Sequence, residues 1–230
     1  MKILLIILLI LIILCEMDRN QYISHDIKKY YINFFPKQIF FGIHNTLYKL
    51  STNSYIYNTD NMIIDKYIKV KIPFIKKNFF KINLIKHTVY AHETTNMFEK
   101  NYSYKYITFK KFNKINHNNL NKFPYIKDII TKFPNIRTCF ISIMSKSLTI
   151  PFHRGPYNGI LRYHIPIYIK NPSQCYIQVL NTKLYYKNSF MFDDTYPHKL
   201  VKLDDELRVV LICDIDNPYS IFLLHKYLNV

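Results

Sequence analysis

The stretch PFHRGPYNGILRYHIPI, residues 151–167, decides how the second half of this chain is interpreted. It holds two of the only three glycines in the chain, Gly155 and Gly159. A chain so poor in glycine that places two of them close together is expected to need unusual backbone geometry there. The residues that follow are expected to form a strand. Because side chains alternate along a strand, Arg162 and His164 point to the same face.

The sequence after residue 134 has the pattern of antiparallel β-structure. Short segments rich in Ile, Val, Tyr and Phe are separated by turn-like Pro-Ser, Asn-Thr and Asp-Asp pairs. The strands expected from this pattern cover residues 138–144, 160–169, 175–180, 183–186, 189–192 and 207–215. Their close spacing without an intervening helix predicts an antiparallel sandwich or barrel, and a jelly roll is one such fold.

The region before these strands is less regular. Residues 20–133 contain short apolar bursts separated by Asn, Lys and Pro, which predicts a mixed α/β region that packs on the strand-rich core. Within it, residues 125–133 (YIKDIITKF) carry apolar side chains at helical spacing and are followed by a proline, which predicts a short helix. The chain is therefore divided into residues 1–19, 20–133, 134–218 and 219–230, the last being a C-terminal tail.

The segment 1–19 contains an unbroken apolar run over residues 3–15. As a helix this run would span about 20 Å, short of the ~30 Å hydrocarbon core of a membrane. Small residues for signal-peptide cleavage are missing after it, so an uncleaved membrane anchor is favoured over a cleaved segment, which would give a secreted protein. Lys2 and Glu16 on its two sides predict a single-pass protein with a lumenal, extracytoplasmic body. A buried core helix is the alternative.

The chain is strongly basic, with 32 Lys and Arg against 15 Asp and Glu and a formal net charge of +17. The lysines are scattered along the chain rather than clustered, so no dedicated nucleic-acid binding is predicted. Beyond the N-terminal segment the cysteines are Cys139, Cys175 and Cys213, an odd number in apolar, strand-like surroundings. A disulfide and buried free thiols therefore both remain open.

Several of the scarce histidines and arginines fall in the strand-rich region. In the strand expected over residues 207–215, Leu207, Val209, Leu211 and Cys213 share one face and Arg208 takes the opposite one. Arg208, Arg162 and His164 would converge on a small carboxylate if both strands line one barrel. The alternative is that they face solvent on half-exposed strands. His153 and His198 flank these strands, and two neutral imidazoles with open positions suit Fe(II). The carboxylate that often follows two residues after the first histidine is replaced by a glycine, so the residues alone leave a metal site open.

The order of these residues resembles the aspartyl/asparaginyl β-hydroxylase family. The motifs that carry the resemblance are His153-x-Gly155-Pro156-x-Asn158, Leu161-Arg162-x-His164, Phe192-Asp193-Asp194-x-x-x-His198 and Arg208, over about residues 134–218. The resemblance implies a double-stranded β-helix (jelly-roll) core and a dioxygenase that depends on Fe(II), 2-oxoglutarate and O2. The expected fold is therefore mainly β, with a mixed α/β N-terminal region and an N-terminal hydrophobic helix attached to that core.

The resemblance also implies roles for particular residues. His153 and His198 would be the two iron ligands, in a family that uses no third protein ligand. Arg208 would pair with the distal carboxylate of 2-oxoglutarate. The same cosubstrate would also be bound by Ser142, Arg162 and His164.

Other positions are assigned less directly by the resemblance. Asp194 would hold an iron-bound water molecule, and a simple turn residue is the alternative. Lys199 and Tyr185–Tyr186 depart from the residues common in relatives and are interpreted as sequence drift outside the site. The implied substrates are Asp or Asn side chains of a peptide or protein, hydroxylated at the β-carbon, with acyl chains of membrane lipids as the alternative. A non-catalytic binding relative is disfavoured because the residue set is intact.

Overall fold

The structure, a computed structural model, describes residues 4–7, 54–82, 88–90, 103–112, 114–155 and 159–217. Most of the predicted hydrophobic segment and the whole of the tail 219–230 lie outside these residues. Of the hydrophobic segment only residues 4–7 are described, and they are helical and exposed. Within the described ranges no helix has the length and apolar character needed to cross a membrane. The membrane anchor therefore stays a prediction.

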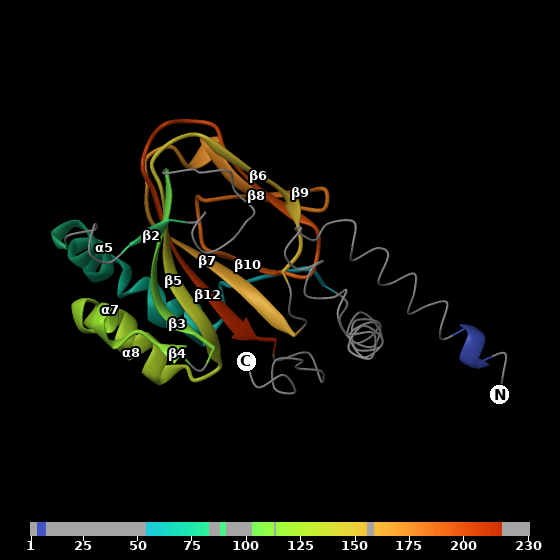
Figure 1. Cartoon of the computed structure of the whole chain (residues 1–230), viewed down its shortest axis with the longest axis horizontal. Coiled ribbons are helices and arrows are strands. Elements are labelled where there is room, and N and C mark those ends of the chain that lie inside the picture. Colours follow the sequence, from blue (N-terminus) through green and yellow to red (C-terminus); the bar gives the residue numbers. More distant parts are fainter. Residues whose placement is uncertain are drawn as a thin grey trace.

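The fold is built on two antiparallel β-sheets whose inner faces share one apolar cluster (Figure 1). The large sheet contains, in spatial order, β1 (Ile56–Tyr57), β10 (Phe190–Asp193), β7 (Ile160–Ile169), β12 (Arg208–Asp216), β5 (Ile136–Met144), β3 (Tyr104–Lys111) and β2 (Val89–Tyr90), with β4 (Lys114–Ile115) paired to β3. The small sheet contains β6 (Leu148–His153), β11 (His198–Lys202), β8 (Cys175–Val179) and β9 (Thr182–Tyr185).

The connections between the strands follow a symmetric pattern. From β5 to β12 each strand lies in the opposite sheet to the one before it, except that β8 and β9 pair within the small sheet. Eight strands distributed in this way over two facing sheets form a jelly roll. The prediction of a mainly β, antiparallel fold is confirmed, and its six predicted strands correspond to β5, β7, β8, β9, β10 and β12.

Two strands of the small sheet, β6 and β11, were not predicted from the sequence. The strand β6 contains Pro151, and a proline within an apolar run argues against a strand. The proline is tolerated because β6 lies at the edge of its sheet, where one side of the backbone has no partner strand. The strand β11 reads HKLVK, and its lysines obscured the pattern, although Lys202 is buried with its ammonium group on Asp204.

Helices cover the outer face of the large sheet, while the small sheet lies on its other side (Figure 1). They are α4 (Ile63–Lys69), α5 (Ile72–Lys81), α7 (His117–Lys122) and α8 (Pro124–Lys132), and a 3₁₀ turn, η2 (Pro172–Gln174), precedes β8. The short helix predicted over residues 125–133 is confirmed as α8. The strand β3, which precedes the predicted boundary at residue 134, pairs with β5 in the large sheet. The domain limits themselves stay predictions.

The alternation of side chains sorts the strand residues between two apolar clusters. On β7, Leu161 and Tyr163 join the cluster beneath the helices, whereas Arg162 and His164 point between the two sheets. The outer cluster also contains the cysteine pair of β5 and β12, Cys139 and Cys213, whose sulfur atoms are 3.7 Å apart. Both thiols and that of Cys175 are buried and free, which decides the question left open by their number.

Candidate active site

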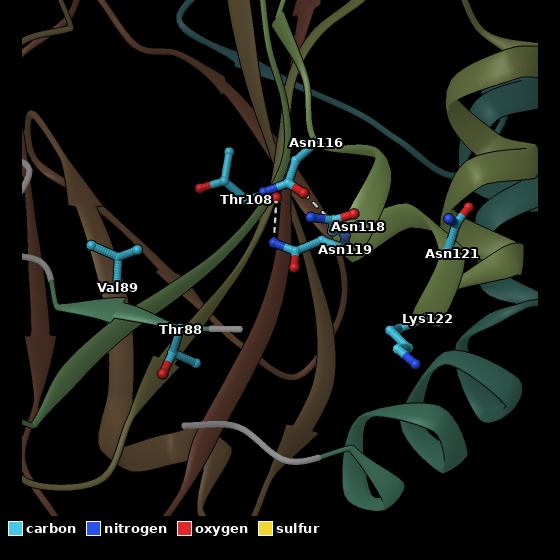
Figure 2. A pocket seen from close by; sticks show the side chains of 8 residues that line it. All are labelled: Thr88, Val89, Thr108, Asn116, Asn118, Asn119, Asn121 and Lys122. Carbon is cyan, nitrogen blue, oxygen red and sulfur yellow. Dashed lines mark hydrogen bonds between the residues drawn. The ribbon is translucent and has the colours of Figure 1, made fainter. Parts of the chain in front are cut away.

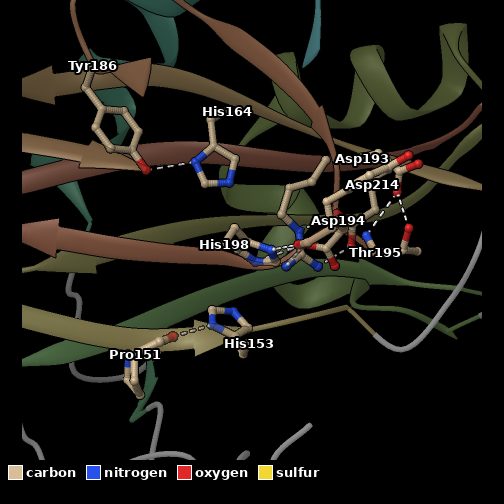
Figure 3. Close-up of polar contacts among 11 residues, drawn as sticks. Pro151, His153, His164, Tyr186, Asp193, Asp194, Thr195, His198 and Asp214 are labelled. Atoms are coloured by element: carbon tan, nitrogen blue, oxygen red, sulfur yellow. Dashed lines mark hydrogen bonds and ion pairs between the residues drawn. The ribbon is translucent and has the colours of Figure 1, made fainter. Parts of the chain in front are cut away.

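Two histidines meet where β6 and β11 pair in the small sheet. His153 and His198 are directly opposite each other, and their ring centroids are 4.2 Å apart. The His153 Nδ1 atom lies 2.8 Å from the Pro151 carbonyl oxygen (Figure 3). The His198 Nδ1 atom lies 2.8 Å from the Tyr196 carbonyl oxygen, again two residues earlier. A carbonyl oxygen can only accept a hydrogen bond, so each Nδ1 carries the hydrogen and each Nε2 carries the lone pair.

The surroundings keep both rings of this histidine pair uncharged. Burial lowers the pKa of His153 below its usual value. Burial, followed by the neighbouring His153, lowers the pKa of His198 well below its usual value. Two neutral imidazoles, each oriented by a hydrogen bond from its other nitrogen to the backbone, fit a divalent first-row metal ion. Among the described residues, no group of three or more His, Cys, Asp or Glu side chains has the arrangement of a metal site.

The carboxylate of Asp194 occupies the space beside this pair where a side chain at position 155 would lie. The backbone N–H of Gly155 donates to the Asp194 carbonyl oxygen over 2.7 Å. A Cβ atom added to Gly155 would lie 1.8 Å from Asp194 Oδ2, so only glycine fits. Asp194 Oδ1 lies 3.3 Å from His198 Nε2. The glycine is therefore required by a close approach, and the role of Asp194 beside the metal stays a prediction.

A carboxylate and a lone pair this close repel each other unless positive charge is nearby. Arg162 supplies part of that charge through Nη1, which is 2.8 Å from Asp194 Oδ1. Its other nitrogens form a bidentate pair with Asp214, with Nε 2.8 Å and Nη2 3.0 Å from the two carboxylate oxygens. Burial acts to lower the pKa of Arg162, but the two carboxylates outweigh it and hold that pKa above its usual value. The predicted role of Arg162 in cosubstrate binding stays a prediction.

Asp214 was missed by the sequence reasoning. It lies on β12 at the same alternation as Arg208, and it is an acidic residue at the end of an otherwise apolar run, which is a usable signal. Burial raises the pKa of its carboxyl group, and the charge of Arg162 partly offsets this.

A second arginine, Arg208, lies at the other end of the inner face without such compensation. Its side chain is completely buried, so the alternative of a solvent-facing residue is wrong. It donates from Nη1 to Ser142 Oγ over 2.9 Å and from Nη2 to the Tyr186 hydroxyl over 2.5 Å. Within the part of the chain that the structure describes, its Nε has no hydrogen-bond partner and no carboxylate forms an ion pair with its guanidinium. A buried guanidinium without a counter-charge needs an anionic ligand.

His164 connects this arginine with the histidine pair. Its Nδ1 lies 2.8 Å from the Tyr186 hydroxyl (Figure 3). Its Nε2 is buried and has no hydrogen-bond partner among the described residues. Burial, followed by the charge of Arg208, lowers its pKa well below the usual value. The ring of Phe192 contacts both His164 and His198, with centroids 5.5 Å and 5.0 Å away. We call Arg208, Ser142, His164 and Tyr186 the Arg208 cluster.

The interpretation of Tyr185–Tyr186 as drift outside the site is wrong for Tyr186. The Tyr186 side chain is buried and contacts both Arg208 and His164, whereas Tyr185 is 39% exposed. Tyr186 follows the last residue of β9, so its contacts depend on the pairing of the small sheet and have no local sequence signal. Lys199 points away from the cluster, with its ammonium group 4.9 Å from the ring centroid of Phe152.

A pocket of about 580 Å³ lies in a different part of the fold (Figure 2). It runs along β2, β3 and α7 and is lined by threonines, asparagines, Val89 and Lys122. Asn119 in its wall donates to the Thr108 carbonyl oxygen over 2.9 Å. None of the site residues predicted from the sequence lines this pocket.

Comparison with known proteins identifies the family. Residues 74–218 match the profile of the family described as aspartyl/asparaginyl beta-hydroxylase. The chain therefore belongs to the aspartyl/asparaginyl β-hydroxylase family, as the resemblance indicated. The match extends further towards the N-terminus than the resemblance seen in the motifs.

The individual relative and the two solved structures described next are each 35% identical to this chain or less. The chain is 35% identical over 92 residues to an ornithine lipid ester-linked acyl 2-hydroxylase from Rhizobium tropici, an alignment that covers 39% of this chain and 33% of that protein. The chain thus spans about a third of the length of this relative. A prolyl hydroxylase from Trichoplax adhaerens, solved with a peptide of hypoxia inducible factor, has a TM-score of 0.41 and 13% identity, covering 77% of this chain and 90% of its own. A 2OG-Fe(II) oxygenase family oxidoreductase from Burkholderia pseudomallei has a TM-score of 0.37 and 11% identity, covering 74% and 98%.

Proposed function

We propose that this protein is an Fe(II)- and 2-oxoglutarate-dependent hydroxylase. The observation that carries the proposal is the combination of two features in the space between the two sheets, one contributed by the small sheet and one by the large sheet. The histidine pair presents two lone pairs whose opposite nitrogens are fixed on the backbone. Beyond Phe192, Arg208 is fully buried without a counter-charge. A divalent metal fits the first feature, and the distal carboxylate of a 2-oxo acid fits the second.

Different residues would bind the metal and the cosubstrate. His153 and His198 would hold Fe(II), and Arg208 would pair with the distal carboxylate of 2-oxoglutarate, assisted by Ser142 and His164. With O2, the bound metal and cosubstrate supply the oxidising chemistry. The chain itself contributes orientation, a buried environment and electrostatics. Between the two features, the ring of Phe192 contacts both His164 and His198.

Asp194 would act beside the metal and would not itself be one of the metal ligands. Its carboxylate lies close to His198 Nε2 and is anchored by Arg162. This position supports a role in holding a water molecule at the metal, where many oxygenases have a third carboxylate ligand. The cost of burying Asp194 is reduced by Arg162, whose remaining nitrogens are taken by Asp214.

Two substrates are proposed, and they share one chemical feature. The first is the β-carbon of Asp or Asn in a peptide or protein, the reaction for which the family is named. The second is the 2-carbon of an ester-linked acyl chain, which the name of the Rhizobium tropici relative favours. In both cases the carbon that is hydroxylated is bonded directly to a carbonyl carbon. Membrane association through the N-terminal segment would bring the second substrate within reach.

The test is succinate formation by the full chain with Fe(II), ascorbate and 2-oxoglutarate. We would compare three conditions: no added substrate, Asp- and Asn-containing peptides, and vesicles of ester-linked lipids. A slow basal turnover that His153→Ala abolishes is expected, with a stimulation by one substrate class. If folded wild-type protein binds neither iron nor 2-oxoglutarate and forms no succinate under any condition, the proposal is wrong.

A further inference from the structure

We propose that Tyr186 is a positioning residue that fixes the ring tautomer of His164, so that His164 presents a neutral N–H donor to the carboxylate bound by Arg208. The inference rests on the proposed function, because the carboxylate is that of the cosubstrate. It assigns a role to a tyrosine at a position that the motifs do not include. It also predicts how the Arg208 cluster recognises its anion.

The direction of each hydrogen bond in the cluster follows from donor and acceptor chemistry. A guanidinium has only donors, so in the contact with Arg208 Nη2 the Tyr186 oxygen must accept. A phenol oxygen can accept a second bond, but among the described residues the Tyr186 hydroxyl hydrogen has no acceptor other than His164 Nδ1 at 2.8 Å, so the hydroxyl donates there. The bonds therefore run from Arg208 to Tyr186 and from Tyr186 to His164. Nδ1 accepts, and the hydrogen of the neutral ring must be on Nε2.

The protonation states of the three groups agree with this direction. Burial raises the pKa of Tyr186 above its usual value, so the hydroxyl keeps its hydrogen. Burial and the charge of Arg208 keep the imidazole of His164 uncharged. His164 therefore has one hydrogen to place, and the Tyr186 hydroxyl decides which nitrogen carries it.

The ring of His164 is also held in its plane. Phe190 lies against one side, with ring centroids 5.2 Å apart and an interplanar angle of 27°. Phe192 lies 5.5 Å away at 57°. A ring fixed in this way cannot rotate freely to exchange its two nitrogens. The Nε2–H thus remains a buried donor without a partner, as does Arg208 Nε.

The two buried donors without a partner in the Arg208 cluster, His164 Nε2 and Arg208 Nε, indicate what kind of ligand the cluster binds. Each would cost free energy if it stayed unpaired. An anionic ligand with oxygen acceptors would satisfy both, and a carboxylate suits the geometry of a guanidinium. Since His164 contributes no charge, Arg208 alone balances one carboxylate. The cluster is thus expected to bind the singly charged distal carboxylate of a 2-oxo diacid, with His164 as a neutral second donor.

The experiment uses the full chain in three forms: wild type, Tyr186→Phe and the control Tyr185→Phe. Tyr186→Phe removes only the hydroxyl, whereas Tyr185→Phe removes the hydroxyl of an exposed neighbour. The first readout is the tautomer of His164, obtained by NMR of the histidine ring nitrogens without metal or cosubstrate and assigned with a His164→Gln variant. The second readout is the affinity for 2-oxoglutarate, measured calorimetrically with Mn(II) in place of iron.

The wild type and Tyr185→Phe are expected to hold the Nε2–H tautomer. In Tyr186→Phe the Nδ1–H form is expected to appear, and affinity for 2-oxoglutarate is expected to fall roughly tenfold to a hundredfold, as for loss of a bond to a charged group, with Mn(II) affinity unchanged. A wild-type His164 in the Nδ1–H form would overturn the inference even if Tyr186→Phe does not fold. So would an unchanged 2-oxoglutarate affinity. The expected tautomer without any 2-oxoglutarate binding would instead overturn the proposed function.

Discussion

The two arginines of the inner face of the large sheet, the half-buried Arg162 and the fully buried Arg208, differ in how their charge is balanced. Arg162 is paired by Asp194 and Asp214, so each of its three nitrogens has a carboxylate partner within 3.0 Å. Arg208 is more deeply buried, yet its partners are two neutral hydroxyl groups. Burial without compensation is costly, so it persists where a ligand supplies the missing charge. Arg162 therefore stabilises the site through its ion pairs, whereas the charge of Arg208 is expected to be balanced by a bound ligand.

Substitution in the histidine pair is expected to have the largest effect, because these two histidines would hold the metal on which the activity depends. His198→Ala should abolish iron binding and succinate formation, since one of only two imidazole ligands is lost. Iron content of the purified protein and succinate release are the measurements. His117→Ala changes an exposed histidine on α7 and serves as the control. Full iron occupancy in His198→Ala would refute the ligand assignment.

Removal of the compensated arginine should destabilise the protein. Arg162→Met leaves the carboxylates of Asp194 and Asp214 close together without their cation. Breaking this ion pair is expected to cost about 3 kcal/mol, near the lower end of the usual range for buried pairs because the Arg162 side chain is 24% exposed. Urea denaturation of the metal-free protein measures the change in free energy of unfolding. A change below about 0.5 kcal/mol would mean that the two carboxylates do not depend on Arg162.

Removal of the uncompensated arginine should have the opposite sign. Arg208→Met deletes a buried charge that has no carboxylate partner among the described residues, so the metal-free protein should keep its stability or gain up to about 1 kcal/mol. The same denaturation experiment, run beside Arg162→Met, is the measurement. Equal losses of stability in the two variants would remove the distinction between the two arginines.

The smallest effect is expected at Lys199, next to His198 in the sequence but directed towards Phe152. Lys199→Gln should change the free energy of unfolding by less than about 1 kcal/mol, the size of an exposed cation–π contact. Iron content should equal that of the wild type. Thermal unfolding and metal analysis check both expectations, and a loss of iron would mean that Lys199 belongs to the site.

The sequence predicted those features that depend on local pattern. The alternation along β7 placed Arg162 and His164 on one face, and the Ile- and Val-rich runs located six strands of the jelly roll. The features that it missed arise from pairing between distant segments. The edge strand β6 tolerates Pro151, which a local reading rejects. The contacts of Asp214 and Tyr186 exist because β12 and the end of β9 approach residues far away in the chain.

Gly155 illustrates the same limit. Because glycine is scarce in this chain, Gly155 was marked as a position of special geometry. The sequence alone could not show that the Asp194 carboxylate occupies the space where a side chain at position 155 would lie. The roles of His153 and His198 came from motif order, whereas the positions of their hydrogens came from the ring orientation that brings each Nδ1 to the carbonyl oxygen two residues earlier. The chemistry was therefore predictable in kind, and the tautomers and charge balance were not.

The measurement that tests the account most directly is equilibrium binding of 2-oxoglutarate to the Mn(II)-loaded full chain, with wild type and Arg208→Met compared. The account predicts that the wild type binds and that Arg208→Met loses roughly 2–5 kcal/mol of binding free energy, because one partner of a buried charge pair is gone. Mn(II) affinity should be the same in both proteins. Equal affinity for 2-oxoglutarate in the two proteins would contradict the claim that Arg208 is held uncompensated for the cosubstrate.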